Sequence, residues 1–454
     1  MTVVRFTWQA LYAHFKTDDL TALTSSHRRF ASHLLPDLQT MIEEQLAPLS
    51  PKLVGVHQPV EFVPMKLSDL IIPERQDFSI APLQYQDIDI GEEEPYASLN
   101  NGLWLFQIGD EPVAIFLSQF TARTRVVQVE IACLPGEQAS AFSREFLRKI
   151  QAACESSRNY RNKVLSFEAD GACSGMQGTM RVHSLPAVRR NDVVLSAATM
   201  ARLDAQIFDF DRHREGLKRL GQSTRKGILL YGPPGTGKTH VIRYVAANLP
   251  GRTTVLVTAE QMQGIDAYIA LARTLQPSIV VLEDVDLVGR SRENIHGPKA
   301  ESLLNRLLNE MDGLAPEADI LFILTTNRPE HIEEALASRP GRVDEAIEIP
   351  FPDAGCRQRL IELYGHALTF ESGAVADAVA RSHGSSAAYV KEMVRRLAQR
   401  SLARDGADVS RDDVEVVFGD SGVLSSRLNR RIVGLTDKTS RRQNAVEDEC
   451  DCCD

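Results

Sequence analysis

The sequence has no apolar run near the roughly 20 residues with which an α-helix crosses a bilayer. Its first residues, Met1–Trp8, lack the apolar core of a signal peptide. Seven cysteines, an odd number and mostly far apart, do not form the pattern of a disulfide framework. These absences argue against a membrane-spanning or disulfide-stapled chain, and we expect a protein of the reducing cytoplasm.

A positive charge balance is also missing, since the formal net charge is −10. Nucleic acids and anionic membranes both reward a basic surface, so general binding to either is disfavoured, although a local basic patch stays compatible with this balance. The hydrophobic fraction of 43% and the charged fraction of 25% are ordinary for a globular protein. At 454 residues, the chain is long enough for two or three domains.

The first 190 residues carry no catalytic motif. Apolar residues at helical spacing predict a mainly helical region over 1–75. Residues 76–190 predict a small α+β domain, which we expect to recruit a target. Its expected elements are strands at Leu103–Ile108, Pro112–Leu117, Arg125–Ile131 and Val164–Phe167, and a helix at Glu137–Ser156.

A glycine-rich octet lies between an apolar run, Gly227–Tyr231, and a helical pattern, Val241–Ala247. Its members are Gly232, Pro233, Pro234, Gly235, Thr236, Gly237, Lys238 and Thr239. Strand, Gly-x4-Gly-Lys-Thr and helix together are the signature of a phosphate-binding loop. Backbone N–H groups would hold phosphate oxygens, Lys238 would reach the β- and γ-phosphates, and the Thr239 hydroxyl would bind Mg²⁺.

Two later apolar runs are each followed by polar side chains of the kind that act beside such a loop. Ser278–Leu282 has the composition of a buried parallel strand and ends in Glu283 and Asp284. Carboxylates there can hold Mg²⁺ and polarise an attacking water. A third strand, Ile320–Leu324, leads to Asn327, whose amide would lie beside the γ-phosphate and the water.

Arg339 and Arg342 flank a Pro-Gly pair, which suits a rigid corner that projects two guanidinium groups. In isolation, such arginines would be assigned to surface ion pairs. Their position behind the other motifs instead favours arginine fingers, which stabilise charge during phosphoryl transfer at a neighbouring subunit's nucleotide.

This series of motifs strongly resembles the AAA clade of the AAA+ ATPases, over roughly residues 190–420. The resemblance rests also on the segments Leu307–Gly313 and Thr326–Pro329. It implies an α/β P-loop NTPase core over 191–352, a small helical lid over 353–420, ATP with Mg²⁺, and a homo-oligomeric ring, most simply a hexamer, with ATP at the subunit interfaces. Glu283 and Asp284 match the metal-binding and water-activating positions, and Asn327 matches the sensor position.

The lid resemblance adds two further residues to the nucleotide site. Gly384 and Ser385 begin a stretch that looks like the Gly-x-Ser-x-Ala turn near the adenine in this clade. Beyond it, residues 421–454 lose apolar periodicity and predict a disordered tail. The tail ends in three clustered cysteines at 450, 452 and 453, which could bind a soft metal but offer too few fixed ligands for a structural zinc site.

The order Glu283-Asp284 departs from the clade, most members of which have Asp-Glu. Both positions stay acidic, but the reach of the two carboxylates is exchanged, and positioning changes of this size can cost a large rate factor. The same inversion is found in the AAA chaperone that assembles mitochondrial respiratory complex III, which this chain resembles in that respect. We therefore keep hydrolysis as the main prediction.

The segment after the second core strand, Thr254–Thr258, is a second departure. Members of the clade that thread polypeptides carry an aromatic residue before a glycine in this segment, whereas the sequence here offers only Met262 and Tyr268 as gripping residues. We expect Tyr268 to lie on a packed helix face, so processive threading by an aromatic staircase is disfavoured.

The sequence therefore predicts a ring-forming ATPase that remodels a protein or protein complex. One alternative is an ATP-gated switch or scaffold with little turnover. A nucleic-acid motor or loader is less favoured, because the chain is acidic and carries no recognisable nucleic-acid motif.

Overall fold

The computed structural model contains two compact units of the chain. The structure describes residues 5–17, 19–57, 65–72, 78–121, 125–155, 159–167, 180–287, 299–315, 317–331, 341–404 and 406–419. The first unit comprises Met1–Ser184, Gly251–Val257 and Gln261–Val280, and the second comprises Leu185–Pro250, Thr258–Glu260 and Val281–Asp454. Arg339 and the cysteine-rich tail, both predicted to carry chemistry, lie outside the described residues.

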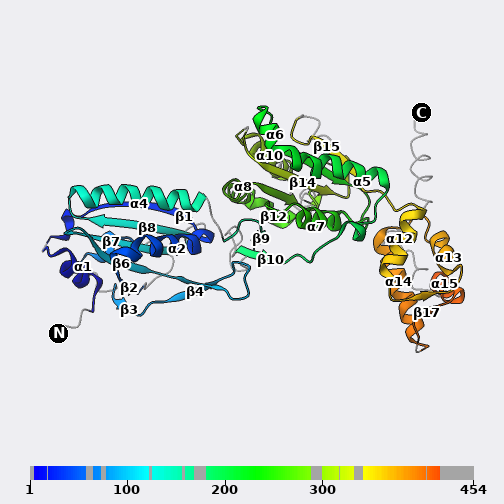
Figure 1. Ribbon diagram of the computed structural model, residues 1–454, viewed down its shortest axis with the longest axis horizontal. Helices are drawn as coiled ribbons and strands as arrows, with labels where there is room; N and C mark the ends of the chain where they lie inside the picture. The colour runs from blue at the N-terminus through cyan, green and yellow to red at the C-terminus, as the bar shows by residue number, and fades with distance from the viewer. Residues whose placement is uncertain are drawn as a thin grey trace, which may run out of the picture. The chain divides into compact units, whose positions relative to one another are not determined.

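An antiparallel sheet organises the beginning of the first unit, with the strand order β1-β8-β7-β6-β2-β3 (Figure 1). The strands are β1 (Thr24–Ala31), β2 (Lys52–Val56), β3 (Ile80–Ala81), β6 (Gly102–Ile108), β7 (Glu111–Thr121) and β8 (Arg125–Cys133). Strands β4 (Tyr85–Ile88) and β5 (Tyr96–Leu99) form a separate hairpin. The predicted turn between β6 and β7 is present, and Gly109 adopts the positive φ of 59° that a tight turn requires.

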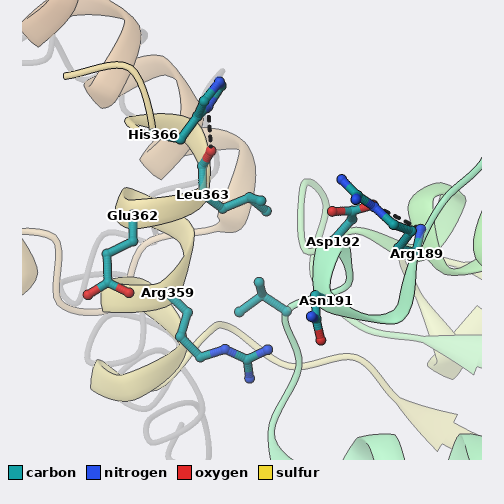
Figure 2. Close-up of a pocket in the computed structure, with 8 residues that line it drawn as sticks. Arg189, Asn191, Asp192, Arg359, Glu362, Leu363 and His366 are labelled. Atoms are coloured by element: carbon teal, nitrogen blue, oxygen red, sulfur yellow. Dashed lines mark hydrogen bonds and ion pairs between the residues drawn. The ribbon is translucent and has the colours of Figure 1, made fainter.

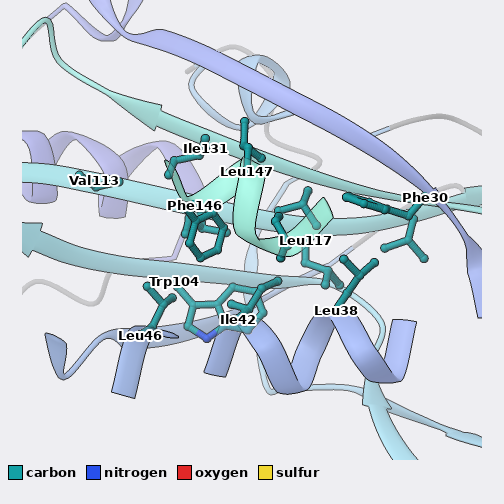
Figure 3. Close-up of a cluster of buried hydrophobic side chains, with 14 of the residues drawn as sticks. Phe30, Leu38, Ile42, Leu46, Trp104, Val113, Leu117, Ile131, Phe146 and Leu147 are labelled. Atoms are coloured by element: carbon teal, nitrogen blue, oxygen red, sulfur yellow. The ribbon is translucent and has the colours of Figure 1, made fainter. Parts of the chain in front are cut away.

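Both faces of this sheet are buried, which explains its long apolar strands. Helices α2 (Leu35–Leu46) and α4 (Glu137–Glu155) pack on one face, where Trp104 and Phe146 join a large apolar cluster (Figure 3). Helices α1 (Thr7–Phe15) and α3 (Leu67–Leu70) contribute to a second cluster with Leu103 and Phe116. Neighbouring residues such as Leu103 and Trp104 belong to different clusters because side chains alternate between the faces of a strand.

The sheet amends the prediction for residues 1–75, whose described part contains helices α1, α2 and α3, in line with a mainly helical stretch, but also two strands. Strands β1 and β2 lie in this stretch and pair with β8 and β6 respectively. Strand β1 gave no alternating signal because it lies at the edge of the sheet, where Phe30 is its one buried residue. The short strand β2 was missed because Gly55 interrupts its apolar pattern, while its missing side chain lets the backbone of Ala81 and Pro82 approach.

A second correction concerns strand β9 (Val164–Phe167), which was assigned to the small α+β domain. It pairs in parallel with β12 (Thr253–Val257), and β10 (Met180–His183) pairs antiparallel with its other edge. A strand of four residues shows its type in the sequence but not its partner. In the same unit, helix η6 (Ala259–Gly264) leads into α8 (Ile265–Thr274).

Parallel strands in the order β14-β11-β15 run through the second unit. They are β11 (Lys226–Tyr231), β14 (Ile320–Thr326) and β15 (Glu345–Glu348). A further strand, β13 (Ser278–Leu282), is completely buried. The accompanying helices are α5 (Ala197–Leu203), the π-helical turn η5 (Asp204–Asp209), α6 (Phe210–Arg219), α7 (Lys238–Asn248) and α10 (Lys299–Asp312). Helices α5 and α6 are thus joined by a π-helical segment.

The lid predicted after residue 353 is helical and has its own apolar core. It consists of α12 (Ala354–Tyr364), α13 (Ala374–Arg381), α14 (Ala387–Leu402) and α15 (Arg411–Phe418), with a short parallel pair, β16 (Thr369–Phe370) and β17 (Asp408–Val409). Side-chain oxygens cap three of these helices: Asp353 caps α12, Ser386 caps α14, and Ser410 caps α15 as predicted.

Among the residues that the structure describes, no helix combines the length and apolar character needed to cross a bilayer. Three of the seven cysteines, Cys133, Cys154 and Cys356, lie within the described ranges, where each is buried and outside any disulfide. Burial raises the pKa of the Cys356 thiol to about 11, which keeps it protonated and unreactive.

Candidate functional site

The glycine-rich octet forms a loop between strand β11 and helix α7. Its glycines have positive φ angles of 147° at Gly232, 76° at Gly235 and 106° at Gly237, which side chains with a Cβ resist. Gly237 is the N-cap of α7, so the first free N–H groups of the helix face the loop. This backbone is suited to anion binding, as the sequence predicted.

Lys238 lies across the inside of this loop. Its ammonium group donates hydrogen bonds to the carbonyl oxygens of Gly232 and Pro233, at 2.8 and 3.0 Å. Desolvation lowers the pKa of the buried Lys238 side chain, and the charges of Asp284 and Asp286 oppose this shift. Lys238 is thus held close to two carboxylates, whereas the next residue, Thr239, is exposed and available to a ligand.

Strands β13 and β14 bring the predicted carboxylate and sensor residues together. Asp284 follows β13 with a positive φ of 51°, and its backbone N–H donates to the Thr325 hydroxyl at 2.9 Å. The Asn327 amide at the end of β14 donates to the Asp284 carboxylate at 3.1 Å. A left-handed conformation is uncommon for a residue other than glycine, and here it aims this carboxylate at the sensor amide.

Asp286 is a functional residue that the sequence analysis did not assign. It is buried, and its carboxylate accepts hydrogen bonds from the Thr326 hydroxyl at 3.0 Å and the Asn327 backbone N–H at 3.2 Å. Asp286 therefore fixes the backbone from which Asn327 reaches Asp284. The sequence does contain an indication of this role. Asp286 is a third acidic residue after a buried strand, and a buried carboxylate needs a hydrogen-bonding partner.

The donor set around the loop fits a magnesium ion. Mg²⁺ prefers oxygen ligands, and Thr239 contributes a hydroxyl while Glu283 contributes a carboxylate. Within the described part of the chain, the Glu283 side chain has no recorded hydrogen-bond partner, whereas Asp284 and Asp286 are both engaged. Glu283 is thus the carboxylate here whose oxygens remain available to a ligand.

Arg342 lies at the opposite end of strand β11. The backbone N–H of Asp344 donates to the carbonyl of Gly227, near the start of the strand, and the Gly227 N–H donates to the Asp344 carboxylate, both at 2.8 Å. The carbonyl of Arg342 is packed against the same glycine. The Arg342 guanidinium forms an ion pair with Asp312 at the end of α10. At ~3.3 Å per strand residue, roughly 15–20 Å of strand separates this point from the phosphate loop.

The lid touches the phosphate loop at the predicted turn. The Ala388 N–H at the start of α14 donates to the Gly235 carbonyl at 3.0 Å. Gly384 has a positive φ of 74°, and the buried Ser385 hydroxyl donates to the Ser382 carbonyl at 2.6 Å. Ser385 therefore shapes the turn that seats the lid on the loop.

A cavity of about 720 Å³ lies between helix α12 and the segment before α5 (Figure 2). Its lining residues are Arg189, Asn191, Asp192, Val194, Arg359, Glu362, Leu363 and His366. The Asp192 carbonyl contacts the His240 ring at 3.0 Å, and His240 follows Thr239 on α7, so this wall is tied to the phosphate loop. No sequence motif indicated these residues, because they come from two segments 165 positions apart in the chain (Arg189 to Ala354).

The segment after β12 contains no exposed aromatic side chain among its described residues. Met262 and Tyr268, the two residues considered as gripping candidates, are 1% and 4% exposed. The Tyr268 ring packs edge-on against Phe167, with ring centroids 4.9 Å apart. The expectation that Tyr268 lies on a packed helix face is therefore confirmed.

Comparison with known families gives one match, to the ATPase family associated with various cellular activities (AAA), over residues 228–351. This range contains the end of strand β11, the phosphate loop, the carboxylates, Asn327 and Arg342.

Curated proteins of several kinds are similar to the same part of the chain. The 26S proteasome regulatory subunit 8 homolog of Schizosaccharomyces pombe is 31% identical over 233 residues, 47% of this chain and 58% of that protein. The ATP-dependent zinc metalloprotease FtsH 2 of Thermoanaerobacter sp. is 29% identical over 51% of this chain and 45% of its own length. The cell division cycle protein 48 homolog of Archaeoglobus fulgidus is 32% identical over 42% of this chain and 27% of its own length.

The chain spans about half the length of the curated relatives that it matches. The phosphate loop, the carboxylates after a buried strand and the helix-flanked, mostly parallel sheet confirm the predicted α/β P-loop NTPase fold. The chain contains an AAA ATPase domain, with homologues among the proteasome regulatory subunits, the FtsH proteases and the Cdc48 proteins.

Proposed function

We propose that the protein hydrolyses ATP in a homo-oligomeric ring and uses the energy to remodel a protein or protein complex. The hydrogen bond from Asn327 to Asp284, close to Lys238, carries the hydrolytic part of this proposal. It holds a carboxylate and an amide where a γ-phosphate and an attacking water would meet. Asp284 then acts as the water-polarising carboxylate and Asn327 positions the water.

The remaining residues divide the binding task. The backbone of Gly232–Thr239 surrounds the phosphates and Lys238 neutralises their charge. Thr239 and Glu283 would hold Mg²⁺, which supplies charge neutralisation to the bound triphosphate when present. Gly384 and Ser385 keep the lid turn against the loop through Ala388.

The cavity beside α12 has the volume of a nucleoside site, since small-molecule sites in proteins measure ≈ 300–1,000 Å³. Val194 and Leu363 offer aliphatic surface to a flat base, and Asn191 offers an amide. We propose that the adenosine part of ATP lies here. A Val194→Asp variant is expected to weaken ATP binding at least tenfold while inorganic phosphate binding stays unchanged.

Ring formation is proposed because Arg342 lies too far from its own phosphate loop to act there. In a ring, the arginine of one subunit would reach the nucleotide of the next, as in trans-acting arginine fingers. Arg339 is proposed to share this role. We propose six subunits, in keeping with the resemblance to AAA ATPases.

The target is proposed to be a protein that binds the first unit. The names of the relatives include a proteasome regulatory subunit and ATP-dependent metalloproteases, which supports work on polypeptides. The burial of Met262 and Tyr268 argues against a gripping aromatic in η6 and α8. The order Glu283-Asp284 resembles that of the complex III assembly chaperone, and on this resemblance we propose a chaperone-like role.

Steady-state phosphate release with Mg²⁺-ATP tests hydrolysis, with Lys238→Ala as the control. Turnover no higher than this control at every protein concentration would contradict the proposal. Targets are then identified by the proteins that co-purify with an Asp284→Asn variant in ATP.

An ATP-gated switch with little turnover is the second candidate. The reversed reach of Glu283 and Asp284 favours it, together with the absence of an exposed gripping aromatic among the described residues of η6 and α8. ATP-dependent assembly, measured by light scattering, without phosphate release would support the switch.

A further inference from the structure

Strand β1 is the outermost strand at one side of the first unit's sheet. All eight of its residues pair with β8, from Thr24 opposite Cys133 to Ala31 opposite Val126. No other described strand pairs with its outer edge. In an antiparallel ladder, alternate residues direct their N–H and C=O groups to opposite sides, so this edge presents a row of backbone donors and acceptors.

Two of the usual protections of an edge strand, a bulge and a proline, are absent from β1. Its register with β8 is continuous, so it contains no bulge, and its sequence contains no proline. Six of its eight residues are exposed, and three of these are the small polar Thr24, Ser25 and Ser26. Phe30 anchors the strand by pointing into the apolar cluster (Figure 3). The edge is therefore both firmly held and sterically open within the described part of this unit.

Two guanidinium groups flank this edge, one on each face of the sheet, because Arg28 and Arg29 are adjacent in the strand. Arg28 donates to the Gln151 side chain at 3.2 Å. Arg29 donates to the Gln128 side chain at 3.0 Å and lies 5.5 Å from the Phe120 ring centroid. These partners are neutral, and neither arginine has an ion pair within the described ranges. The edge thus carries positive charge in a chain whose net charge is −10.

We propose that the outer edge of β1 binds an extended acidic segment of a protein partner as an additional strand of the sheet. Backbone hydrogen bonds would give affinity, and acidic side chains on both faces of the added strand would meet Arg28 and Arg29. A second copy of β1 would fit poorly, because pairing two such strands brings like charges together. The proposal rests on the proposed role of the first unit in target recruitment and names the chemistry that it recognises.

The direct test uses the full-length protein and a fluorescein-labelled octapeptide of two Glu-Glu-Thr-Thr repeats, which has Glu on both faces of an extended strand, with fluorescence anisotropy as the readout. We expect saturable binding of this peptide and none of its Lys-Thr counterpart. Two further peptides carry N-methyl groups on alternate residues, in the two possible registers. Only one register removes the N–H groups that face β1, so one peptide should lose binding at least tenfold while the other binds normally.

Hydrogen exchange distinguishes strand addition from charge attraction alone. Binding should protect part of the amides of residues 24–31 and leave the already paired amides of β8 unchanged. The Arg28→Glu/Arg29→Glu variant should bind about tenfold more weakly or worse. A Lys52→Glu variant makes the same kind of charge reversal on β2, away from this edge, and should bind normally.

Three results would overturn the proposal: no saturable binding, equal binding of both N-methylated peptides, or binding without protection of residues 24–31. The peptide variants keep it testable even if the arginine variant fails to fold. The Lys238→Ala protein should bind the peptide as the wild type does. A wild-type protein that binds the peptide but releases no phosphate would therefore contradict the proposed ATPase alone, and a wild-type protein with phosphate turnover but no peptide binding would contradict only the edge.

Discussion

The two ends of strand β11 differ in the polar and charged groups that surround them. Its carboxyl end leads into a phosphate loop that has a buried lysine, two engaged carboxylates and an aligned amide close by. Its amino end holds Arg342, which pairs with Asp312 and retains a buried guanidinium nitrogen without a hydrogen-bond partner. Under the proposed function, one end would bind and position a triphosphate with its own residues, whereas Arg342 at the other end lies too far away to reach that triphosphate.

This difference supports the proposal that the site is divided between copies of the chain. Binding needs only the residues around the loop, and we expect it in a single subunit. Fast hydrolysis would need the amino end of a neighbour's β11. Variants at the two ends should therefore fail in different ways, and the predictions below are ordered by the size of the expected effect.

The largest effect is expected for Lys238→Ala. Removal of the ammonium group leaves the phosphate charge uncompensated inside the loop, so turnover should fall ~100-fold or more. Phosphate release and the binding of a fluorescent ATP analogue should both be reduced. Lys226 lies on the same strand at its amino end and bonds to Gln206, so Lys226→Ala is the matched control and should keep its turnover. An equal loss of turnover in Lys238→Ala and Lys226→Ala would indicate a folding defect, and the two ends of β11 would then not differ in their effect on turnover.

Arg342→Ala should bind ATP normally and hydrolyse it ~10²–10³-fold more slowly, because an arginine finger acts on the transition state. Mixing it with Lys238→Ala should recover part of the turnover, since some interfaces then combine an intact loop with an intact arginine. Arg219→Ala, a change at an exposed arginine on α6, serves as the control. No recovery despite verified co-assembly would mean that Arg342 is structural.

The residues near the carboxyl end of β11 could be located from the sequence because short motifs, each directly after an apolar run, mark them. The octet, Glu283, Asp284 and Asn327 each follow an apolar strand, and parallel strands place their carboxyl ends at one edge of the sheet. Sequence could not supply the orientation of these side chains. The positive φ of Asp284 and the role of Asp286 depend on hydrogen bonds from β14, some 40 residues further along the chain.

Regions whose partners are distant in sequence were predicted less well. The helical pattern of residues 1–75 concealed β1, a polar edge strand with a single buried residue, and β2, a strand of five residues. Strand β9 was recognised and assigned to the small α+β domain, but its pairing with β12 was missed because it joins segments about 90 residues apart. The nucleoside-sized cavity was missed for the same reason, since its two walls share no motif.

Asp284→Asn and Glu283→Gln should separate the two carboxylates. Asp284→Asn removes the charge that polarises the water while keeping the bond to Asn327, so turnover should fall ~10–10³-fold with ATP still bound. Glu283→Gln should instead raise the Mg²⁺ concentration needed for half-maximal turnover. The readouts are phosphate release across a magnesium titration and retention of labelled ATP after gel filtration. An unchanged magnesium requirement in Glu283→Gln would contradict its assignment as a metal ligand.

The smallest effect is expected for Asp312→Asn, which tests what the ion pair at the amino end does. If Asp312 holds Arg342 away from the neighbouring nucleotide, the pair must open before hydrolysis, and its loss should speed turnover. Asp312 is the exposed partner of this pair, and ion pairs at a protein surface contribute about 0.2–1 kcal/mol, which limits the gain to roughly fivefold. Asp377→Asn breaks a comparable pair with Arg381 on the lid and should leave turnover unchanged. A slower Asp312→Asn enzyme with normal assembly would show instead that Asp312 orients Arg342 for catalysis. The ion pair would then hold Arg342 in its active position, and it would not need to open before hydrolysis.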